Sequence, residues 1–305
     1  MLSGTTAVTL LPDGRIKVWD LVDGRERCAL PQDPPGSRRW PMALSPGRQI
    51  LATVGSTIEL WDVGSGARRQ ALAWTLGPYW SVVACAFSPD GGLLACGVEP
   101  HSELYTQVDC VETILLWDVA SGRQLHALQG DAGDMNPPFV ASVAFSPDGL
   151  ILAAGGVNGA ISLFDVATAE RVRRISVGRA ETKALAFSPD GRVLGSSGGL
   201  LDLAGQRRPL KLKGHTDTVQ AIAFAPNEPI VATGSYDTTV KLWDRWSGRE
   251  LRTLAGHGGP VVALAFLPDG STLASESEDR TIRLWHTASG DHLRTLRAPG
   301  TPKDD

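Results

Sequence analysis

The sequence has no long hydrophobic run and contains little cysteine or lysine. No apolar run reaches the ~18 residues that span a membrane, and Met1–Asp20 lacks the basic start and apolar stretch of a secretion signal. The four cysteines are scattered and form no Cys-x-x-Cys pair, which excludes a disulfide scaffold and gives no support to a zinc site. Arginine outnumbers lysine by 23 to 6, which we interpret as the GC-rich coding bias of a bacterium. We therefore expect a cytoplasmic bacterial protein.

Two short motifs recur along the 305 residues. Phe-Ser-Pro begins at Phe87, Phe145 and Phe187, variants begin at Phe224 and Phe266, and Asp-Gly follows in four of these five places. Trp-Asp and its variants recur at spacings of 42, 56, 47, 37, 42 and 42 residues. A period of this length is typical of repeat architectures. The seven units end near Trp19, Trp61, Trp117, Phe164, Leu201, Trp243 and Trp285.

Each unit contains the pattern of four short strands. In the clearest unit the alternating, β-branched runs are Val219–Phe224, Ile230–Tyr236, Val240–Trp243 and Glu250–Leu254, with turn residues between them. A four-stranded sheet cannot bury both of its faces alone, so the units must stack, and stacking in a ring leaves only short edges exposed. We predict an all-β, seven-bladed β-propeller of four-stranded antiparallel blades. It would form a single domain over residues 1–297, followed by a disordered tail over residues 298–305.

The units resemble the WD-repeat β-propeller family, with bacterial-type Phe-Ser-Pro-Asp-Gly turns, over roughly Thr6 to Leu296. Two units carry the family's Gly-His pair, with the histidine 28 residues before the tryptophan in both. The resemblance implies that each of these units contains a hydrogen-bonded tetrad. The two tetrads would be His215, Ser235, Asp237 and Trp243, and His257, Ser277, Asp279 and Trp285. Serine, histidine and aspartate also make up a hydrolase triad, but the same set occurs twice at identical spacing, so we interpret both as structural.

Three units depart from the pattern. The position 28 residues before Trp19 precedes the first residue, so the first blade is expected to lack its innermost strand. We interpret the chain as a fragment of a longer protein, or as one with a mis-set start, rather than as an open ring. The fifth unit has little room for a third strand before Leu201, so we expect a weak blade with a tight turn and an outer strand over Arg207–Lys213. The third unit has about fourteen extra residues between Gly97 and Val111.

The loops near that insertion are the candidate partner-binding surface. They hold aromatic residues outside the repeat positions, and the resemblance places them on one face, opposite Trp246. The segment from Gln70 to Glu170 contains one basic residue, Arg123, and eleven acidic residues. Its net charge of −10 favours association with a basic partner. Packing between blades is the alternative role for each aromatic. The candidate residues are Trp40, Trp74, Tyr79, Trp80, Glu99, His101, Glu103, Tyr105, Asp131, Asp134, Met135, Tyr236 and Glu278.

These features favour a non-catalytic scaffold that binds a protein or peptide with a basic surface. We expect no cofactor, metal, nucleic acid, membrane or small-molecule substrate. One alternative is a sensor or regulatory module cut from a larger multidomain signalling protein. Another is an enzyme at the mouth of the central channel, which is disfavoured because the inner strands are apolar or small. Nucleic-acid binding by the basic residues of Arg207–Lys213 is disfavoured because no aromatics are interleaved with them and the chain is acidic.

Overall fold

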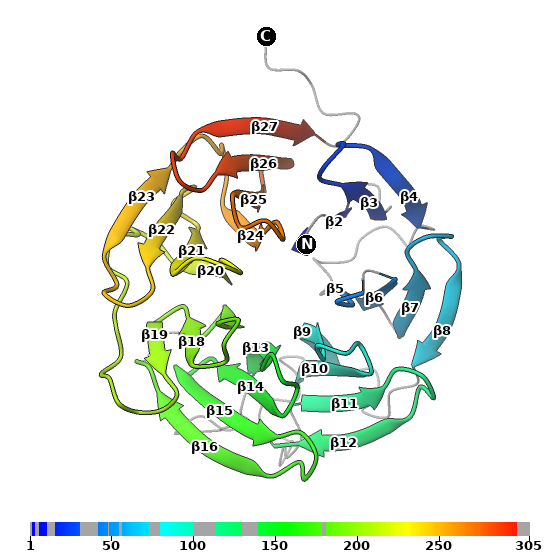
Figure 1. Ribbon diagram of the computed structural model, residues 1–305. Coiled ribbons are helices and arrows are strands. Elements are labelled where there is room, and N and C mark those ends of the chain that lie inside the picture. Colours follow the sequence, from blue (N-terminus) through cyan, green and yellow to red (C-terminus); the bar gives the residue numbers. More distant parts are fainter. Residues whose placement is uncertain are drawn as a thin grey trace.

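The computed structural model describes residues 2–3, 6–10, 16–30, 42–47, 49–54, 57–72, 80–100, 114–129, 140–178 and 181–297. These residues form antiparallel β-sheets and turns, and the seven sheets stand around a central axis as the blades of a propeller (Figure 1). The predicted all-β, seven-bladed fold is confirmed. Across the described ranges, no helix is long and apolar enough to cross a membrane.

Consecutive strands are neighbours in every sheet, and the first strand of each sheet lies nearest the axis (Figure 1). The first three blades contain β1–β4 (Leu2–Ser3, Thr6–Leu10, Ile16–Asp20, Glu26–Leu30), β5–β8 (Met42–Leu44, Ile50–Val54, Ile58–Asp62, Arg68–Leu72) and β9–β12 (Trp80–Phe87, Leu93–Pro100, Ile114–Asp118, Gln124–Leu128). The last four contain β13–β16 (Val140–Phe145, Ile151–Gly156, Ala160–Asp165, Arg171–Ser176), β17–β19 (Leu185–Phe187, Val193–Ser196, Gly199–Asp202), β20–β23 (Val219–Phe224, Ile230–Ser235, Val240–Asp244, Glu250–Leu254) and β24–β27 (Val261–Phe266, Thr272–Ser277, Thr281–His286, His292–Arg297).

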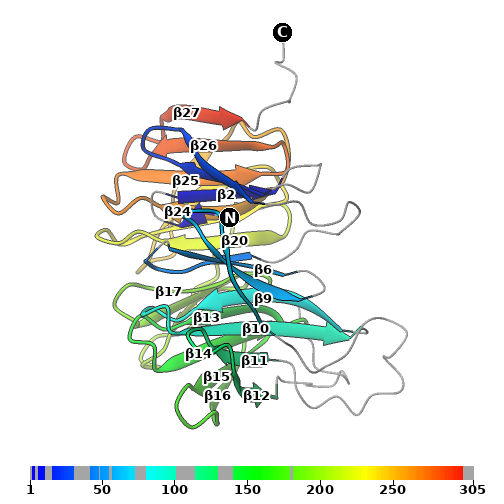
Figure 2. The ribbon, with the colours of Figure 1, turned by 90° about the vertical axis from the view of Figure 1, so that its right-hand side faces the viewer.

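The turns lie on two opposite faces of the ring, which Figure 2 shows edge-on. On the face that we call the turn face, the first and third turns of a blade meet; for example, the Arg245 N–H donates to the Pro229 carbonyl at 2.8 Å. On the other face, which we call the tetrad face, the middle turn of a blade meets the connection that enters the blade. There the Tyr236 N–H donates to the Thr218 carbonyl at 3.0 Å, and the Glu278 N–H donates to the Pro260 carbonyl at 2.9 Å.

The core is divided into seven clusters of buried apolar side chains, one between each pair of neighbouring blades. The same arrangement closes the ring, because Trp19 and Leu21 of the first blade pack against Leu284 and Leu296 of the seventh. At this junction Arg294 also donates to the Asp23 carbonyl at 3.2 Å. The ring therefore closes by side-chain packing between two blades that do not exchange strands.

The first blade has three full strands, β2, β3 and β4, as the spacing before Trp19 predicts. The innermost position is not empty, however. Its occupant is the two-residue strand β1, which pairs Leu2 with Ala7 and Ser3 with Thr6. The expected absence of an innermost strand therefore holds only for a strand of full length. The β1 strand also lies against β24 of the seventh blade.

The fifth blade differs from the prediction at its outer edge. Its sheet has three strands, and the outer strand predicted over Arg207–Lys213 is reduced to one bridge between Leu200 and Leu210, with N–H to carbonyl distances of 2.8 and 2.9 Å. Pro209 offers no N–H to extend the ladder on one side of Leu210. The expected tight turn is present, because Ser196 pairs with Gly199 across only two intervening residues.

Glycine allows the blades to approach closely at four equivalent positions in the second strands. A Cβ added to Gly97, Gly155, Gly195 or Gly234 would lie 2.6 to 2.7 Å from a side-chain atom of the next blade. Real Cβ contacts are longer than this, so any side chain there would push the blades apart. These glycines therefore set the spacing between the third and fourth, fourth and fifth, fifth and sixth, and sixth and seventh blades.

We predict that Gly234→Ala lowers the free energy of unfolding by about 1–3 kcal/mol, because its methyl group would overlap Val261. Chemical denaturation of the full chain measures this change. Gly47→Ala is the matched control, since an added Cβ there has no heavy atom within 4 Å. Equal stabilities of the two variants would contradict close blade contact at Gly234.

Candidate functional site

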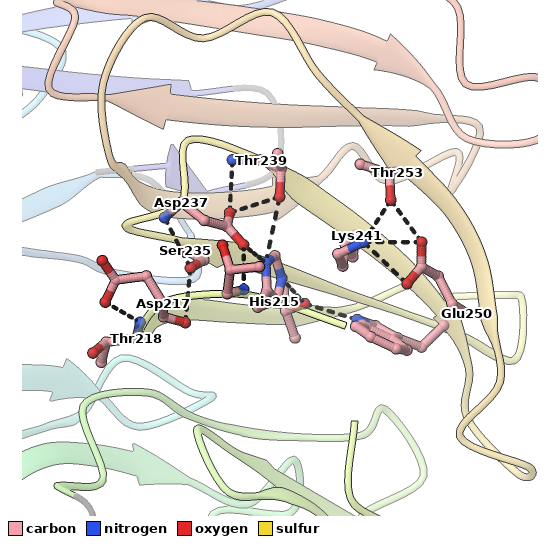
Figure 3. Close-up of polar contacts among 12 residues, drawn as sticks. His215, Asp217, Thr218, Ser235, Asp237, Thr239, Lys241, Glu250 and Thr253 are labelled. Carbon is pink, nitrogen blue, oxygen red and sulfur yellow. Dashed lines mark hydrogen bonds and ion pairs between the residues drawn. The ribbon is translucent and has the colours of Figure 1, made fainter. Parts of the chain in front are cut away.

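The sixth blade contains a chain of buried hydrogen bonds that joins its third strand to the tetrad face (Figure 3). Trp243 Nε1 donates to Thr233 Oγ1 at 2.7 Å, and Thr233 Oγ1 lies 2.8 Å from His215 Nε2. On the other side of the imidazole, His215 Nδ1 lies 2.7 Å from Asp237 Oδ2. With the carboxylate ionised, all donors point the same way: indole to hydroxyl, hydroxyl to imidazole, imidazole to carboxylate.

The seventh blade repeats this arrangement with different hydroxyl chemistry. Trp285 Nε1 donates to Ser275 Oγ at 2.8 Å, and Ser275 Oγ lies 2.7 Å from His257 Nε2. His257 Nδ1 then lies 2.9 Å from Asp279 Oδ2. The repetition shows that a serine and a threonine hydroxyl are interchangeable in this network.

The structure corrects the identity of the hydroxyl in both tetrads. The resemblance implies Ser235 and Ser277 as the hydroxyl residues, but these lie two residues further along the strand than Thr233 and Ser275. Each instead bonds to the connection that enters its blade: Ser235 Oγ donates to the Asp217 carbonyl at 3.0 Å, and Ser277 Oγ to the Gly259 carbonyl at 2.8 Å. Sequence spacing does not distinguish the two positions, because residues two apart in a strand share a face.

The two aspartates organise the middle turns of their blades. Asp237 accepts from the Thr239 hydroxyl at 2.6 Å and from the Thr216 N–H at 3.0 Å, in addition to His215. Burial raises the pKa of Asp237, but the hydrogen bonds from Thr239, His215 and backbone N–H groups outweigh it and lower this pKa to about 2. Asp279 has the equivalent partners, and its pKa also lies below its usual range. Both carboxylates are therefore anionic anchors at neutral pH.

Hydroxyl, histidine and carboxylate stand in the order of a hydrolase triad, but this site has no accessible nucleophile. Thr233 is 1% exposed and Ser275 is 0% exposed, and each hydroxyl already accepts from a tryptophan. A substrate carbonyl therefore cannot approach either oxygen. In the described part of the chain, no group of three His, Cys, Asp or Glu residues is arranged to hold a metal ion. The tetrads are structural by this geometry.

The other blades keep only parts of the network. In the second blade Trp61 Nε1 donates to Thr53 Oγ1 at 2.8 Å. In the third blade the same register position holds Cys96, and the buried Nε1 of Trp117 has no hydrogen-bond partner among the described residues. In the fourth blade Asn158 occupies the turn position of the aspartate and accepts from the Ala160 N–H at 3.0 Å. These blades therefore depend more on packing than the sixth and seventh blades do.

The described part of the tetrad face presents few of the predicted partner-binding residues. Tyr236 is 37% exposed, and Lys183 Nζ lies 5.9 Å from its ring centroid. Glu278 is exposed in the equivalent turn of the seventh blade. Figure 2 shows β10 extending beyond the strands of the other blades on this face, and β9 accompanies it there through the pairs Trp80 with Pro100 and Ser81 with Glu99. Trp80 is only partly exposed and packs against the cluster between the second and third blades, so its side chain contributes to the ring itself.

The remaining candidates lie outside the described residues, and their participation stays a prediction. They are Trp40, Trp74, Tyr79, His101, Glu103, Tyr105, Asp131, Asp134 and Met135. Sequence reasoning missed Lys183 as a neighbour of Tyr236. The two residues are on different blades, and the contact follows from the closeness of the fifth and sixth blades near the axis.

The fold is a seven-bladed β-propeller, and the two repeats that hold complete tetrads are similar to WD repeats. The family model described as "WD domain, G-beta repeat" matches residues 207–244 and 248–286, and each of these stretches contains one complete tetrad. A second model, "Anaphase-promoting complex subunit 4 WD40 domain", matches residues 121–190. These matches support the WD-repeat family.

Several curated proteins are similar to this chain. "WD repeat-containing protein SL1-17" of Schistosoma mansoni is 30% identical over 55% of this chain and 57% of its own length. "Nuclear distribution protein PAC1" of Arthroderma otae is 31% identical over 76% of this chain and 46% of its own length. "Guanine nucleotide-binding protein subunit beta" of Zea mays is 32% identical over 46% and 41%, respectively. The chain therefore spans less than two thirds of each of these relatives.

We predict that Thr233→Val lowers the free energy of unfolding by about 2–4 kcal/mol, because Trp243 Nε1 and His215 Nε2 both lose their hydroxyl partner inside the blade. The matched control is Thr253→Val on the exposed outer strand of the same blade. Chemical denaturation compares the two variants. A loss no larger than that of the control would show that Thr233 does not link the network.

We predict the opposite effect for Cys96→Ser in the third blade. The serine oxygen would give the buried Trp117 Nε1 the acceptor that Thr53 gives Trp61, and so raise the free energy of unfolding by about 1 kcal/mol. Cys96→Ala is the control, because it removes the sulfur and adds no acceptor. If the serine variant is no more stable than the alanine variant, the indole N–H gains nothing from an acceptor at this position.

Proposed function

We propose that this protein is a non-catalytic scaffold that binds a protein or peptide partner on the tetrad face. The observation that carries the proposal is an exposed aromatic, Tyr236, beside a cation, Lys183, on a ring fixed by seven packed interfaces. Exposed aromatic side chains on a rigid support supply contact area at little entropic cost, which is typical of the centre of an interface.

The partner is proposed to carry a basic surface. The sector between Gln70 and Glu170 has a net charge of −10, and Glu278 adds an exposed acid on the tetrad face. Such a field accelerates encounter with a cationic partner more than it strengthens the final complex. The predicted loop residues, from Trp40 to Met135, would surround this surface.

Two of the relatives are named as a nuclear distribution protein and as the β subunit of a guanine nucleotide-binding protein. By analogy with those names, the chain would act by binding, either alone or as a sensor or regulatory module of a larger signalling protein. A channel-mouth enzyme is the weaker proposal, because the residues of the inner strands are mostly apolar or small. We propose a bacterial setting from the arginine-rich composition, although the three relatives named above are eukaryotic. We propose a cytoplasmic setting because no apolar run of the given sequence reaches the ~18 residues that span a membrane.

The test is a comparative pull-down with the full chain, followed by binding kinetics. We expect at least one protein to be retained by the wild type and lost by the Tyr236→Ala, Glu278→Lys double variant. For that partner, Tyr236→Ala should raise the dissociation rate, and Glu278→Lys should lower the association rate and weaken its salt dependence.

The control is Leu150→Ala, which removes an apolar side chain that is 62% exposed on the turn face. It should retain the same partner with unchanged rates. Recovery of an identical set of proteins by the double variant, recovery of none by the wild type, or loss through the control alone would contradict binding on the tetrad face.

A further inference from the structure

One turn on the turn face departs from the repeat at two adjacent positions. After the aspartate that ends the third strand, five blades place an aliphatic residue and then a small residue or valine; these pairs are Leu21-Val22, Val63-Gly64, Val119-Ala120, Val166-Ala167 and Leu203-Ala204. The sixth blade has Arg245 and Trp246 at these two positions. At the first position an arginine therefore replaces an aliphatic residue. At the second position a tryptophan, the largest side chain, replaces glycine, alanine or valine.

The backbone of this turn keeps the form seen in the other blades, so the difference lies in the side chains. The Arg245 N–H makes the usual bond to the preceding turn, and Asp244 Oδ1 accepts from the Ser247 N–H at 2.8 Å, as Asp62 does from Ser65. The Arg245 side chain is directed toward the fifth blade, where Nη2 lies 3.3 Å from Asp190 Oδ2. Its guanidinium carbon lies 4.3 Å from the ring centroid of Trp246. Trp246 nevertheless remains 42% exposed.

The irregular edge of the fifth blade brings a second arginine to the same tryptophan. The segment that replaces the missing outer strand places the guanidinium carbon of Arg207 5.2 Å from the Trp246 ring centroid. Arg207 is exposed and makes no ion pair or hydrogen bond with any described residue. Residues 203–213 contain four basic residues and no acidic one. The donors of Arg207 are therefore held near an exposed indole, and no carboxylate of the described residues pairs with them.

We propose that Arg207, Arg245 and Trp246 form a docking surface for an acidic peptide on the turn face. A guanidinium stacked on an aromatic ring has its N–H edge available for a bidentate bond to a carboxylate. The exposed part of Trp246 offers an apolar contact to a residue next to that carboxylate. The matching peptide has aspartate or glutamate beside an aliphatic side chain.

The surface fits a peptide better than a nucleic acid. Trp246 is a single platform, whereas single-stranded nucleic acids stack successive bases on several aromatic side chains. A short peptide needs only one such platform, because it can place one aliphatic side chain on the indole and one carboxylate on Arg207. This surface lies on the face opposite Tyr236, so the inference is independent of the scaffold function proposed for the tetrad face.

The experiment is a selection of random dodecapeptides displayed on phage against the immobilised full chain. The enriched peptides should contain aspartate or glutamate beside an aliphatic residue. In fluorescence anisotropy with the best enriched peptide, Trp246→Ala and Arg207→Glu should each weaken binding about tenfold or more, and Arg207→Gln should weaken it less than Arg207→Glu. Binding should also weaken as salt is added.

Arg25→Glu is the matched control, because it reverses an exposed charge on the turn face of the first blade. It should leave the affinity unchanged, and thermal melts should show that all four variants fold like the wild type. Selection of peptides without acidic residues, selection of none, or equal binding by the wild type and by Trp246→Ala would overturn the proposal. It would also be overturned if a uridine dodecamer bound more tightly than the peptide and lost its binding in the same variants.

Discussion

Burial of both faces of every sheet is the constraint on which this ring depends. A single blade would expose a face of apolar side chains, so each blade is stable only between two neighbours. The seven clusters meet this need at every junction, including the one between the seventh and first blades. Four second-strand glycines allow the close approach that the clusters require. Because the junctions share this burial, a weak blade such as the fifth is supported from both sides.

The tetrads add a different kind of order to this packing. Packing is tolerant of side-chain identity, whereas a chain of four buried polar groups is satisfied in only one geometry. In the sixth and seventh blades that geometry ties the incoming connection to the middle turn and to the tryptophan of the third strand. The third blade lacks the hydroxyl and still forms a complete four-stranded sheet. The network is therefore not needed to form a blade, and its effect is to fix the tetrad face where it occurs.

The repeat pattern predicted the blades because each strand is bounded by turn residues; in the sixth blade every predicted end lies within one residue of the observed end. The pattern did not identify which hydroxyl bonds to His215, because Thr233 and Ser235 lie on the same face of the strand and fit the alternation equally well. It also failed at Leu210 and Leu212, whose alternation indicated an outer strand that the structure reduces to one bridge. The predicted partner-binding residues lie mostly on connections between strands, and a strand period carries no information about the conformation of connections.

Departures from a repeat are informative because the repeat itself shows what packing alone requires. Five blades show that an aliphatic residue at the position of Arg245 is sufficient to fill a junction. Placing an arginine there exchanges apolar burial for one partly exposed ion pair with Asp190, and such pairs contribute about 0–1 kcal/mol. Trp246 stays 42% exposed, and Arg207 beside it makes no ion pair with any described residue. These three residues therefore add little to the stability of the fold, and the acidic peptide that we propose would pair with Arg207 and cover the indole.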